Sequence, residues 1–350
     1  MSTTLSNAEE KSKRRDDGAA RRRPVVRLGI FGVSALIVLL FAETGARAVR
    51  EGFPEPVEWY DANTQVKVEQ MDRYQRRGRR ADYVFAGTSM VFRGVSPLAF
   101  DRTSERHSFS YNAGMLAGMP PVQQRWILEE VEPRLRPRVL VYGLSSLDFQ
   151  ERRYKYPVNA YESAPATRRG FMAAAHRFGA RFLEIVRFRT ELRDPSAWEK
   201  LRASRRKEGP VERTRNRMDT RGHIFKARKN LGRAERLRMR DNVLRDYKIS
   251  AKGSKQISFI ARTLEERDTQ VVLVFLPVPR RYIDVHPQGH EDFDAAKRHI
   301  SRLAARLDVP FLDMSRSMGD KWFVDFTHLG ERGAVLFSRK LRKELQSLGY

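Results

Sequence analysis

The stretch Ala81-Asp82-Tyr83-Val84-Phe85-Ala86-Gly87-Thr88-Ser89-Met90 is an apolar run that stops abruptly at Gly-Thr-Ser. A run rich in Tyr, Val and Phe is typical of a buried strand, and the glycine after it allows a sharp turn. Side chains that follow such a strand stand at the carboxyl edge of the sheet, where open α/β proteins bind their ligands. The sequence therefore predicts that Ser89 lies at this edge.

The stretch Asp325-Phe326-Thr327-His328-Leu329, near the C-terminus, contains the residue types that such a serine needs. A serine acts as a nucleophile only if a base can reach it and a carboxylate orients that base. We predict that Ser89 attacks an acyl carbon, that His328 takes and returns the proton, and that Asp325 orients the imidazole. The alternative is a surface serine and a structural histidine.

Four short blocks resemble the SGNH/GDSL hydrolase superfamily. They are the Gly-x-Ser at Ser89, the segment Tyr111-Asn112-Ala113-Gly114, the strand and loop at residues 139–146, and the Asp-x-x-His at His328. The loop of the third block, which lacks the asparagine usual in the family, resembles that of the membrane-anchored branch, which includes alginate O-acetylation and teichoic-acid D-alanylation proteins. The resemblance implies a three-layer α/β/α fold with a central parallel sheet, of the SGNH/flavodoxin-like type.

The same resemblance implies an oxyanion site formed by the backbone amides of Ser89 and Gly114. The family usually places an asparagine after the third strand, whereas this chain has Gly143-Leu144-Ser145-Ser146-Leu147-Asp148 there. We expect Asp148 to cap the turn that follows. The third oxyanion donor stays open among three residues: Asn112, Ser145 and Ser146.

Strand and helix patterns alternate through most of the remaining chain. Apolar strand patterns recur at 139–142, 271–276 and 309–312, with amphipathic helical spacing between and after them. This alternation favours a parallel sheet with right-handed crossovers. We therefore assign residues 81–350 to one hydrolase-like domain, interrupted by a long insertion at 151–255.

The N-terminal region has the pattern of a membrane anchor. Residues 1–27 are basic and polar, residues 28–46 are largely apolar, and residues 47–80 form a polar connector with scattered aromatic side chains. We predict a cytoplasmic arm, one transmembrane helix at 28–46 and an extracytoplasmic catalytic domain in the cell membrane. A cleaved signal peptide and a buried core helix are the alternatives.

Positive charge is concentrated in the insertion. The whole chain has a formal net charge of +25, and residues 151–255 hold 30 Lys or Arg against 12 Asp or Glu, a net of +18. This balance indicates either a solvated surface or a basic lid that contacts headgroups or an acidic polymer. Nucleic acid is not an expected partner, because no RNA-binding aromatic pattern or zinc-finger ligands accompany the arginines.

The chain contains no cysteine, which excludes disulfides, thiol catalysis and cysteine-ligated metals. His286 and His290 are separated by Pro and Gly, so they do not form the helical pair that binds zinc. We expect no metal and no cofactor. Arg280 and Arg281 follow a strand end and are candidate contacts for an anionic group of the substrate.

These observations together favour a membrane-anchored esterase or O-acyltransferase that acts on a cell-surface polysaccharide through an acyl-serine intermediate. The resemblance implies an acylated glycan or another ester as substrate and a multi-spanning membrane acyltransferase as partner. A non-catalytic glycan-binding or scaffold protein, and a lipase or thioesterase, are the alternatives.

Overall fold

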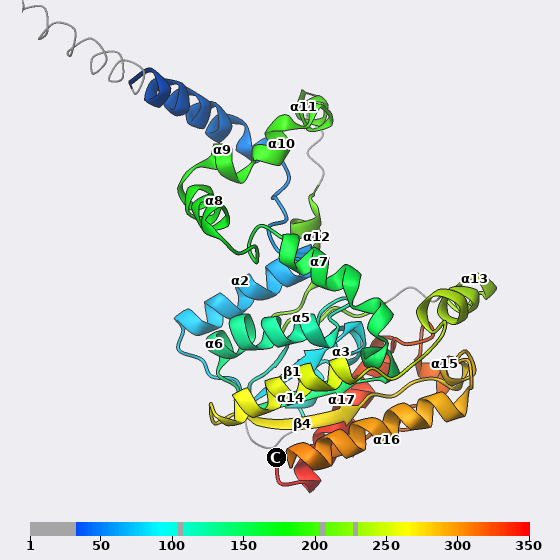
Figure 1. Cartoon of the computed structure of the whole chain (residues 1–350). Helices are drawn as coiled ribbons and strands as arrows, with labels where there is room; N and C mark the ends of the chain where they lie inside the picture. Colours follow the sequence, from blue (N-terminus) through cyan, green and yellow to red (C-terminus); the bar gives the residue numbers. More distant parts are fainter. Residues whose placement is uncertain (1–32, 104–107, 203–207, 227–229) are drawn as a thin grey trace, which may run out of the picture. The chain divides into compact units, whose positions relative to one another are not determined.

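The computed structural model describes residues 33–103, 108–202, 208–226 and 230–350. Its centre is a parallel five-stranded sheet with the strand order β2-β1-β3-β4-β5 (Figure 1). The strands are β1 Tyr83–Gly87, β2 Ser110–Asn112, β3 Val139–Leu144, β4 Gln270–Phe275 and β5 Phe311–Asp313. This architecture confirms the predicted α/β class and the central parallel sheet.

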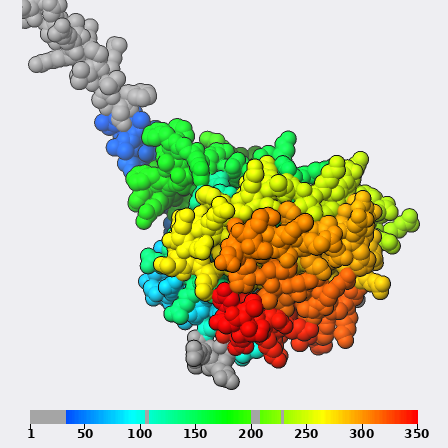
Figure 2. Space-filling view, turned by 60° about the horizontal axis from the view of Figure 1, so that its bottom comes forward, coloured from blue at the N-terminus to red at the C-terminus, as the bar shows by residue number. Residues whose placement is uncertain are grey.

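Helices cover both faces of the sheet. One layer contains α5 (Pro120–Arg125), α14 (Ala251–Glu265) and α16 (His290–Leu307), which contact one another in that order. The other contains α3 (Ser89–Gly94), α4 (Pro97–Asp101) and α17 (Glu331–Ser347). The chain passes from β1 to β2 in one direction along the sheet, and from β2 through β3 and β4 to β5 in the other. Because the crossovers are right-handed, this reversal places the helices of the β1–β2 connection on the opposite face of the sheet from those of the later crossovers. Figure 2 shows α14 and α16 side by side.

Burial explains why the strands read as continuous apolar runs. Every residue of β1 and β3 is buried, as expected for a parallel sheet covered on both faces. The covering helices bury single stripes, such as Ile257, Ile260 and Leu264 of α14. The strand β2 was not predicted, because three residues are too few to show a period.

The predicted connector at 47–80 contains a packed helix. Asp61 is the N-cap of α2 (Ala62–Arg76), and its carboxylate accepts a hydrogen bond from the Thr64 amide. Val66 and Met71 on this helix are fully buried. Much of this segment is therefore part of the folded core.

Other short helices connect these elements. They are η2 Trp126–Val131, α6 Glu132–Leu135, η3 Ser146–Phe149, η4 Glu151–Arg153, α7 Lys155–Ser163, α12 Pro210–Arg217, α13 Arg233–Arg238, η5 Met239–Val243, α15 Arg280–Ile283 and η6 Asp320–Trp322.

The chain divides into two compact units. The sheet unit comprises residues 57–169 and 208–350, and the small unit comprises residues 1–56 and 170–207. The predicted insertion at 151–255 therefore contributes to both units. Within the small unit, the structure describes a helix at 33–49 and five further helices: η1 Arg50–Gly52, α8 Phe171–Phe182, α9 Glu184–Arg187, α10 Arg189–Arg193 and α11 Pro195–Arg202.

Side chains from both segments of the small unit hold it together. The Phe53 ring lies 5.3 Å from the Trp198 ring in an edge-to-face arrangement, and the Glu43 carboxylate accepts the amides of Glu184 and Ile185. The predicted arm at 1–27 and the first part of the predicted span at 28–46 lie outside the described residues. Among the residues that are described, no helix is both long enough and apolar enough to cross a bilayer.

The loop after β3 is built around a buried carboxylate. Asp148 Oδ2 accepts hydrogen bonds from the amide and the hydroxyl of Ser145, at 2.7 and 2.8 Å. This contact confirms the expected capping role of Asp148. Burial raises the pKa of Asp148 to about 6, because desolvation outweighs the hydrogen bonds from Ser145 and the charge of Arg153.

The raised pKa predicts how stability depends on pH. Between about pH 4 and pH 6 the unfolded chain releases the Asp148 proton more readily than the folded chain, so the free energy of unfolding falls as pH rises. Between pH 4.5 and pH 7.5, the free energy of unfolding of the full-length wild type, measured in urea, should fall by roughly 2 kcal/mol more than that of Asp148→Asn. Parallel pH profiles for the two proteins would contradict the raised pKa.

Candidate active site

Ser89 is the first residue of α3 and lies directly beyond the end of β1. The turn between strand and helix requires a glycine, because Gly87 has φ +142° and a Cβ there would lie 2.5 Å from the Gly143 carbonyl oxygen. Thr88 precedes the helix as its N-cap. The backbone of this turn thus places Ser89 at the carboxyl edge of the sheet, as predicted.

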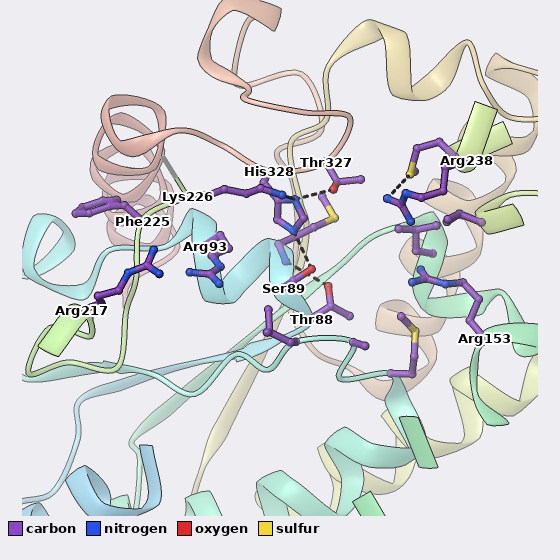
Figure 3. A pocket seen from close by; sticks show the side chains of 17 residues that line it. Thr88, Ser89, Arg93, Arg153, Arg217, Phe225, Lys226, Arg238, Thr327 and His328 are labelled. Carbon is purple, nitrogen blue, oxygen red and sulfur yellow. Dashed lines mark hydrogen bonds between the residues drawn. The ribbon is translucent and has the colours of Figure 1, made fainter. Parts of the chain in front are cut away.

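The structure brings Ser89, His328 and Asp325 together, and Figure 3 shows the contact between Ser89 and His328. His328 Nε2 lies 2.9 Å from Ser89 Oγ, and His328 Nδ1 lies 2.8 Å from Asp325 Oδ2. With its proton on Nδ1, His328 donates to Asp325 and can accept the Ser89 proton on Nε2. The geometry is that of a nucleophile, a base and a group that orients the base. The catalytic role itself stays a prediction.

Backbone amides and a lysine hold the Asp325 carboxylate. The amides of Thr327 and His328 donate to Asp325 Oδ1 at 2.8 and 2.7 Å, and Lys226 Nζ donates to Oδ2. Burial acts to raise the pKa of Asp325, but the hydrogen bonds and charge of His328, with the hydrogen bond from Lys226, outweigh it. The pKa of Asp325 therefore lies well below its usual range, and the group is ionised at neutral pH.

Arg281 holds the backbone of the loop that carries Asp325. Its Nη2 donates to the Asp325 carbonyl at 2.9 Å and to the Phe323 carbonyl at 3.4 Å. Arg280 is exposed, and its backbone amide donates to Asp320 Oδ1. Neither arginine lines the cavity beside Ser89. The structure therefore assigns Arg281 to loop support and does not place either side chain at the predicted substrate contact.

Three predicted oxyanion donors are engaged elsewhere. The Gly114 amide donates to Asn112 Oδ1 at 2.9 Å, and the Asn112 side-chain amide donates to the Val91 and Val95 carbonyls at 2.9 and 2.7 Å. Ser145 donates both its amide and its hydroxyl to Asp148, as described above. Spacing along the chain shows which residues follow a strand, but it does not show where their donors point.

Ser146, the other candidate for that role, belongs to a buried polar group. Its Oγ lies 3.0 Å from His286 Nε2 and contacts the Tyr282 hydroxyl, while His286 Nδ1 lies 3.1 Å from the Tyr282 carbonyl oxygen. Of the residues predicted to donate to the oxyanion, Ser89 lines the cavity and Asn112, Gly114, Ser145 and Ser146 do not. As the first residue of its helix, Ser89 has no acceptor within the helix.

A cavity of about 410 Å³ opens beside Ser89 and His328. Among the described residues that line it, none is acidic and five are cationic: Arg93, Arg153, Arg217, Lys226 and Arg238. Arg93 and Arg217 lie on one side of Ser89, and Arg153 and Arg238 lie on the other (Figure 3). The cavity therefore has a strongly positive wall.

Most of these cations come from the basic insertion, whose place in the site the sequence did not reveal. Its net charge of +18 indicated a basic lid as one alternative, but no pattern selected Arg217, Lys226 or Arg238. The segment is held against the sheet edge by the Arg221 carbonyl, which accepts the Asn112 amide at 2.8 Å, and by buried Lys67, which donates to the Asn112 and Gly222 carbonyls. These contacts join residues far apart in the chain.

Comparison with known proteins gives one family match and several distant structural likenesses. The DltD protein family model matches residues 175–345, just under half of the chain, which includes Asp325 and His328 but not Ser89. Comparison with curated proteins found no match.

The solved structures that resemble the chain have low sequence identity. A proposed acylhydrolase from Bacteroides fragilis is 10% identical with a TM-score of 0.41, over 79% of this chain and 95% of that one. A GDSL-like lipase from Bacteroides thetaiotaomicron is 12% identical with a TM-score of 0.36, over 82% and 98%. A carbohydrate acetylesterase from Sinorhizobium meliloti is 9% identical with a TM-score of 0.39, over 77% and 100%.

The hydrogen bonds of Asn112 predict a structural role. Asn112→Ala leaves two buried carbonyls and the Gly114 amide without their partner, so the free energy of unfolding should fall by roughly 3 kcal/mol. Urea unfolding measures this loss. Asn216→Ala, at an exposed position on α12, is the control and should change stability by less than about 0.5 kcal/mol. Normal stability with lost activity would instead give Asn112 a role in the reaction.

Proposed function

We propose that this chain is a serine-dependent acyl-transfer enzyme of the SGNH/GDSL type, an esterase or an O-acyltransferase. The match of the DltD protein family model to residues 175–345 supports the proposal. The observation that carries the proposal is the 2.9 Å contact between Ser89 Oγ and His328 Nε2, with Asp325 on the other ring nitrogen. The cavity beside Ser89 leaves room for an ester. A serine and a histidine with purely structural roles need no such cavity.

The first half of the reaction follows from the positions of the three residues. Ser89 Oγ attacks the acyl carbon of the ester while His328 Nε2 accepts the hydroxyl proton. Ionised Asp325 stabilises the imidazolium that forms and holds its Nδ1–H in place. His328 then gives the proton to the departing alcohol oxygen, and the acyl group stays bonded to Ser89.

The second half repeats these steps with a new nucleophile. His328 takes a proton from water or from an acceptor hydroxyl, whose oxygen attacks the acyl carbon. The proton then passes to Ser89 Oγ, which is released. Hydrolysis and transfer share the acyl-serine, and the acceptor decides between them.

Backbone amides at the cavity supply the oxyanion site in this proposal. The Ser89 amide at the start of α3 is one donor. The second comes from Leu116 or Ala117, which line the cavity in the loop after β2. Ala117 has φ +49°, a left-handed conformation that turns this loop beside Ser89.

The cellular setting is a further part of the proposal. Residues 28–46 anchor the protein in the cell membrane, with the catalytic unit outside the cytoplasm, the ester of a cell-surface polysaccharide as substrate and a multi-spanning acyltransferase as acyl source. The charge-free apolar run from residue 28 supports the anchor, and so do the exposed apolar side chains within 33–41.

The proposed nucleophile can be tested by covalent labelling. The wild type should react with a serine-directed phosphonate and hydrolyse p-nitrophenyl acetate, whereas Ser89→Ala should do neither, because it lacks the atom that bonds to the acyl group. Asp325→Asn should fold normally but react about 10⁴-fold more slowly, since the amide can hold the wrong imidazole tautomer.

Ser163→Ala, on the exposed end of α7, is the matched control and should keep full activity. Labelling that persists in Ser89→Ala would place the nucleophile elsewhere. If the wild type shows neither labelling nor hydrolysis, the acyl-transfer proposal fails in favour of a non-catalytic protein.

The proposed anchor predicts how the protein leaves the membrane. The full-length chain should stay with membranes through an alkaline carbonate wash, and Leu36→Arg with Leu39→Arg should release it, because each central charge costs about 2.5–3.5 kcal/mol. Leu348→Arg, at an exposed position near the C-terminus, is the control. A C-terminal alkaline phosphatase fusion should be active. Release of the wild type by the wash would contradict the anchor.

A further inference from the structure

Three of the five cations that line the cavity have no carboxylate within 4 Å among the described residues. Lys226 is paired with Asp325, and Arg238 is paired with Glu235. The three without an ion pair are Arg93, Arg153 and Arg217. Surface arginines commonly reach water, but guanidinium groups gathered in one cavity repel one another unless an anion lies between them.

Arg93 is held rigidly on the nucleophile's own helix. It follows Ser89 by four residues on α3, so the two side chains lie on the same face of the helix. Its Nη1 donates to the Ile224 carbonyl at 3.3 Å, and its guanidinium carbon lies 4.6 Å from the centre of the Phe92 ring. Four of its five N–H groups are left for other partners. Arg93 is therefore a preorganised donor beside Ser89.

Arg217 completes a guanidinium pair with Arg93. It is the last residue of α12 and is exposed, with no hydrogen bond or ion pair from its side chain to a described residue. Figure 3 shows the two guanidinium groups turned toward each other on the same side of Ser89. Burial lowers the pKa of Arg93, and the neighbouring charge of Arg217 lowers it further. An anion between the two groups would remove this repulsion.

Arg153, on the opposite side of Ser89, adds to the positive potential of the cavity. Its Nη1 is buried and has no hydrogen-bond partner among the described residues. Burial lowers the pKa of Arg153; the interactions with Tyr282 and Asp148 oppose this shift, and the charge of Arg238 adds to it. A neutral ester would leave these guanidinium groups without an ion pair, whereas an anionic ester would supply one.

We propose that Arg93 and Arg217 form an anion-binding subsite that selects esters carrying a phosphate or carboxylate group close to the reacting acyl carbon. The inference rests on the proposed function, because it assigns the charge of that reaction's substrate. Planar guanidinium groups bind either anion through paired N–H donors. The pair acts in substrate recognition, and Ser89, His328 and Asp325 carry out the bond changes.

Anion binding can be measured without catalysis. Calorimetric titration of full-length Ser89→Ala in detergent uses inorganic phosphate and glucuronate as probes, which separates phosphate from carboxylate recognition. At least one probe should bind, and its affinity should fall as NaCl rises. Adding Arg217→Met or Arg93→Gln should weaken that affinity about tenfold to hundredfold, because charge-assisted hydrogen bonds are lost.

Two further variants make the result specific. Arg217→Lys keeps the charge and should retain part of the affinity, while Arg339→Met, at an exposed arginine on α17, should leave it unchanged. The thermal unfolding midpoint of each variant checks that it is folded. Because Arg217 is exposed, its replacement should disturb the fold less than replacement of Arg93. Equal losses of anion affinity for Arg217→Met and Arg339→Met would mean that overall charge causes the effect, and would contradict the subsite.

A kinetic comparison connects the subsite to the reaction. With Ser89 intact, Arg217→Met should raise the ratio of the KM for mono-p-nitrophenyl succinate to the KM for p-nitrophenyl acetate about tenfold or more. If neither phosphate nor glucuronate binds to Ser89→Ala, the subsite does not exist. The same conclusion follows if adding Arg217→Met and adding Arg93→Gln both leave the affinity of Ser89→Ala for the anion unchanged. If the phosphonate fails to label Ser89 in the wild type, the proposed function is contradicted instead, so the two failures are distinguishable.

Discussion

The close approach of α3 to the carboxyl ends of β1 and β3 is the constraint on which the site depends. A Cβ on Gly87 would lie 2.6 Å from Val91 Cγ2, and one on Gly143 would lie 2.5 Å from the same atom. Two glycines on neighbouring strands therefore let Val91 sit directly against the sheet edge. Because Ser89 begins that helix, its side chain stands above the strand ends and its amide stays outside the helical hydrogen bonds. A bulkier residue at either glycine would move the helix and the serine together.

Charge is distributed unevenly around this scaffold. Asp325 is buried behind His328, and its amide hydrogen bonds and Lys226 keep it ionised. The charged side chains among the described residues that line the cavity are all cationic, and three of them have no ion pair within the described chain. The site therefore keeps its one required negative charge away from the substrate and presents positive charge to it. Electrostatic preorganisation of this kind favours an anionic substrate before any bond is made.

The sheet with its helices and the basic insertion at 151–255 both contribute residues to the site, and their physical roles differ. The sheet and its first and last helices supply the nucleophile, the base and the carboxylate on backbone that is covered on both faces. The basic insertion supplies Arg217, Lys226 and Arg238 on short helices and loops. Lys67, buried beneath Gly222, and the Asn112 amide attach this segment to the sheet edge. Loops on a fixed scaffold can vary in charge without disturbing the reacting groups.

The sequence by itself determined the α/β class, the parallel sheet and the meeting of Ser89, His328 and Asp325. Each of these depends on a local pattern, because parallel strands end at one edge and residues just beyond them meet there. The tertiary structure alone decided the partners of Gly114, Asn112, Ser145 and Arg281. It also decided which insertion cations reach the cavity. Hydrogen-bond direction and contacts between distant segments depend on how the whole chain packs, and neither leaves a period or a spacing in the sequence.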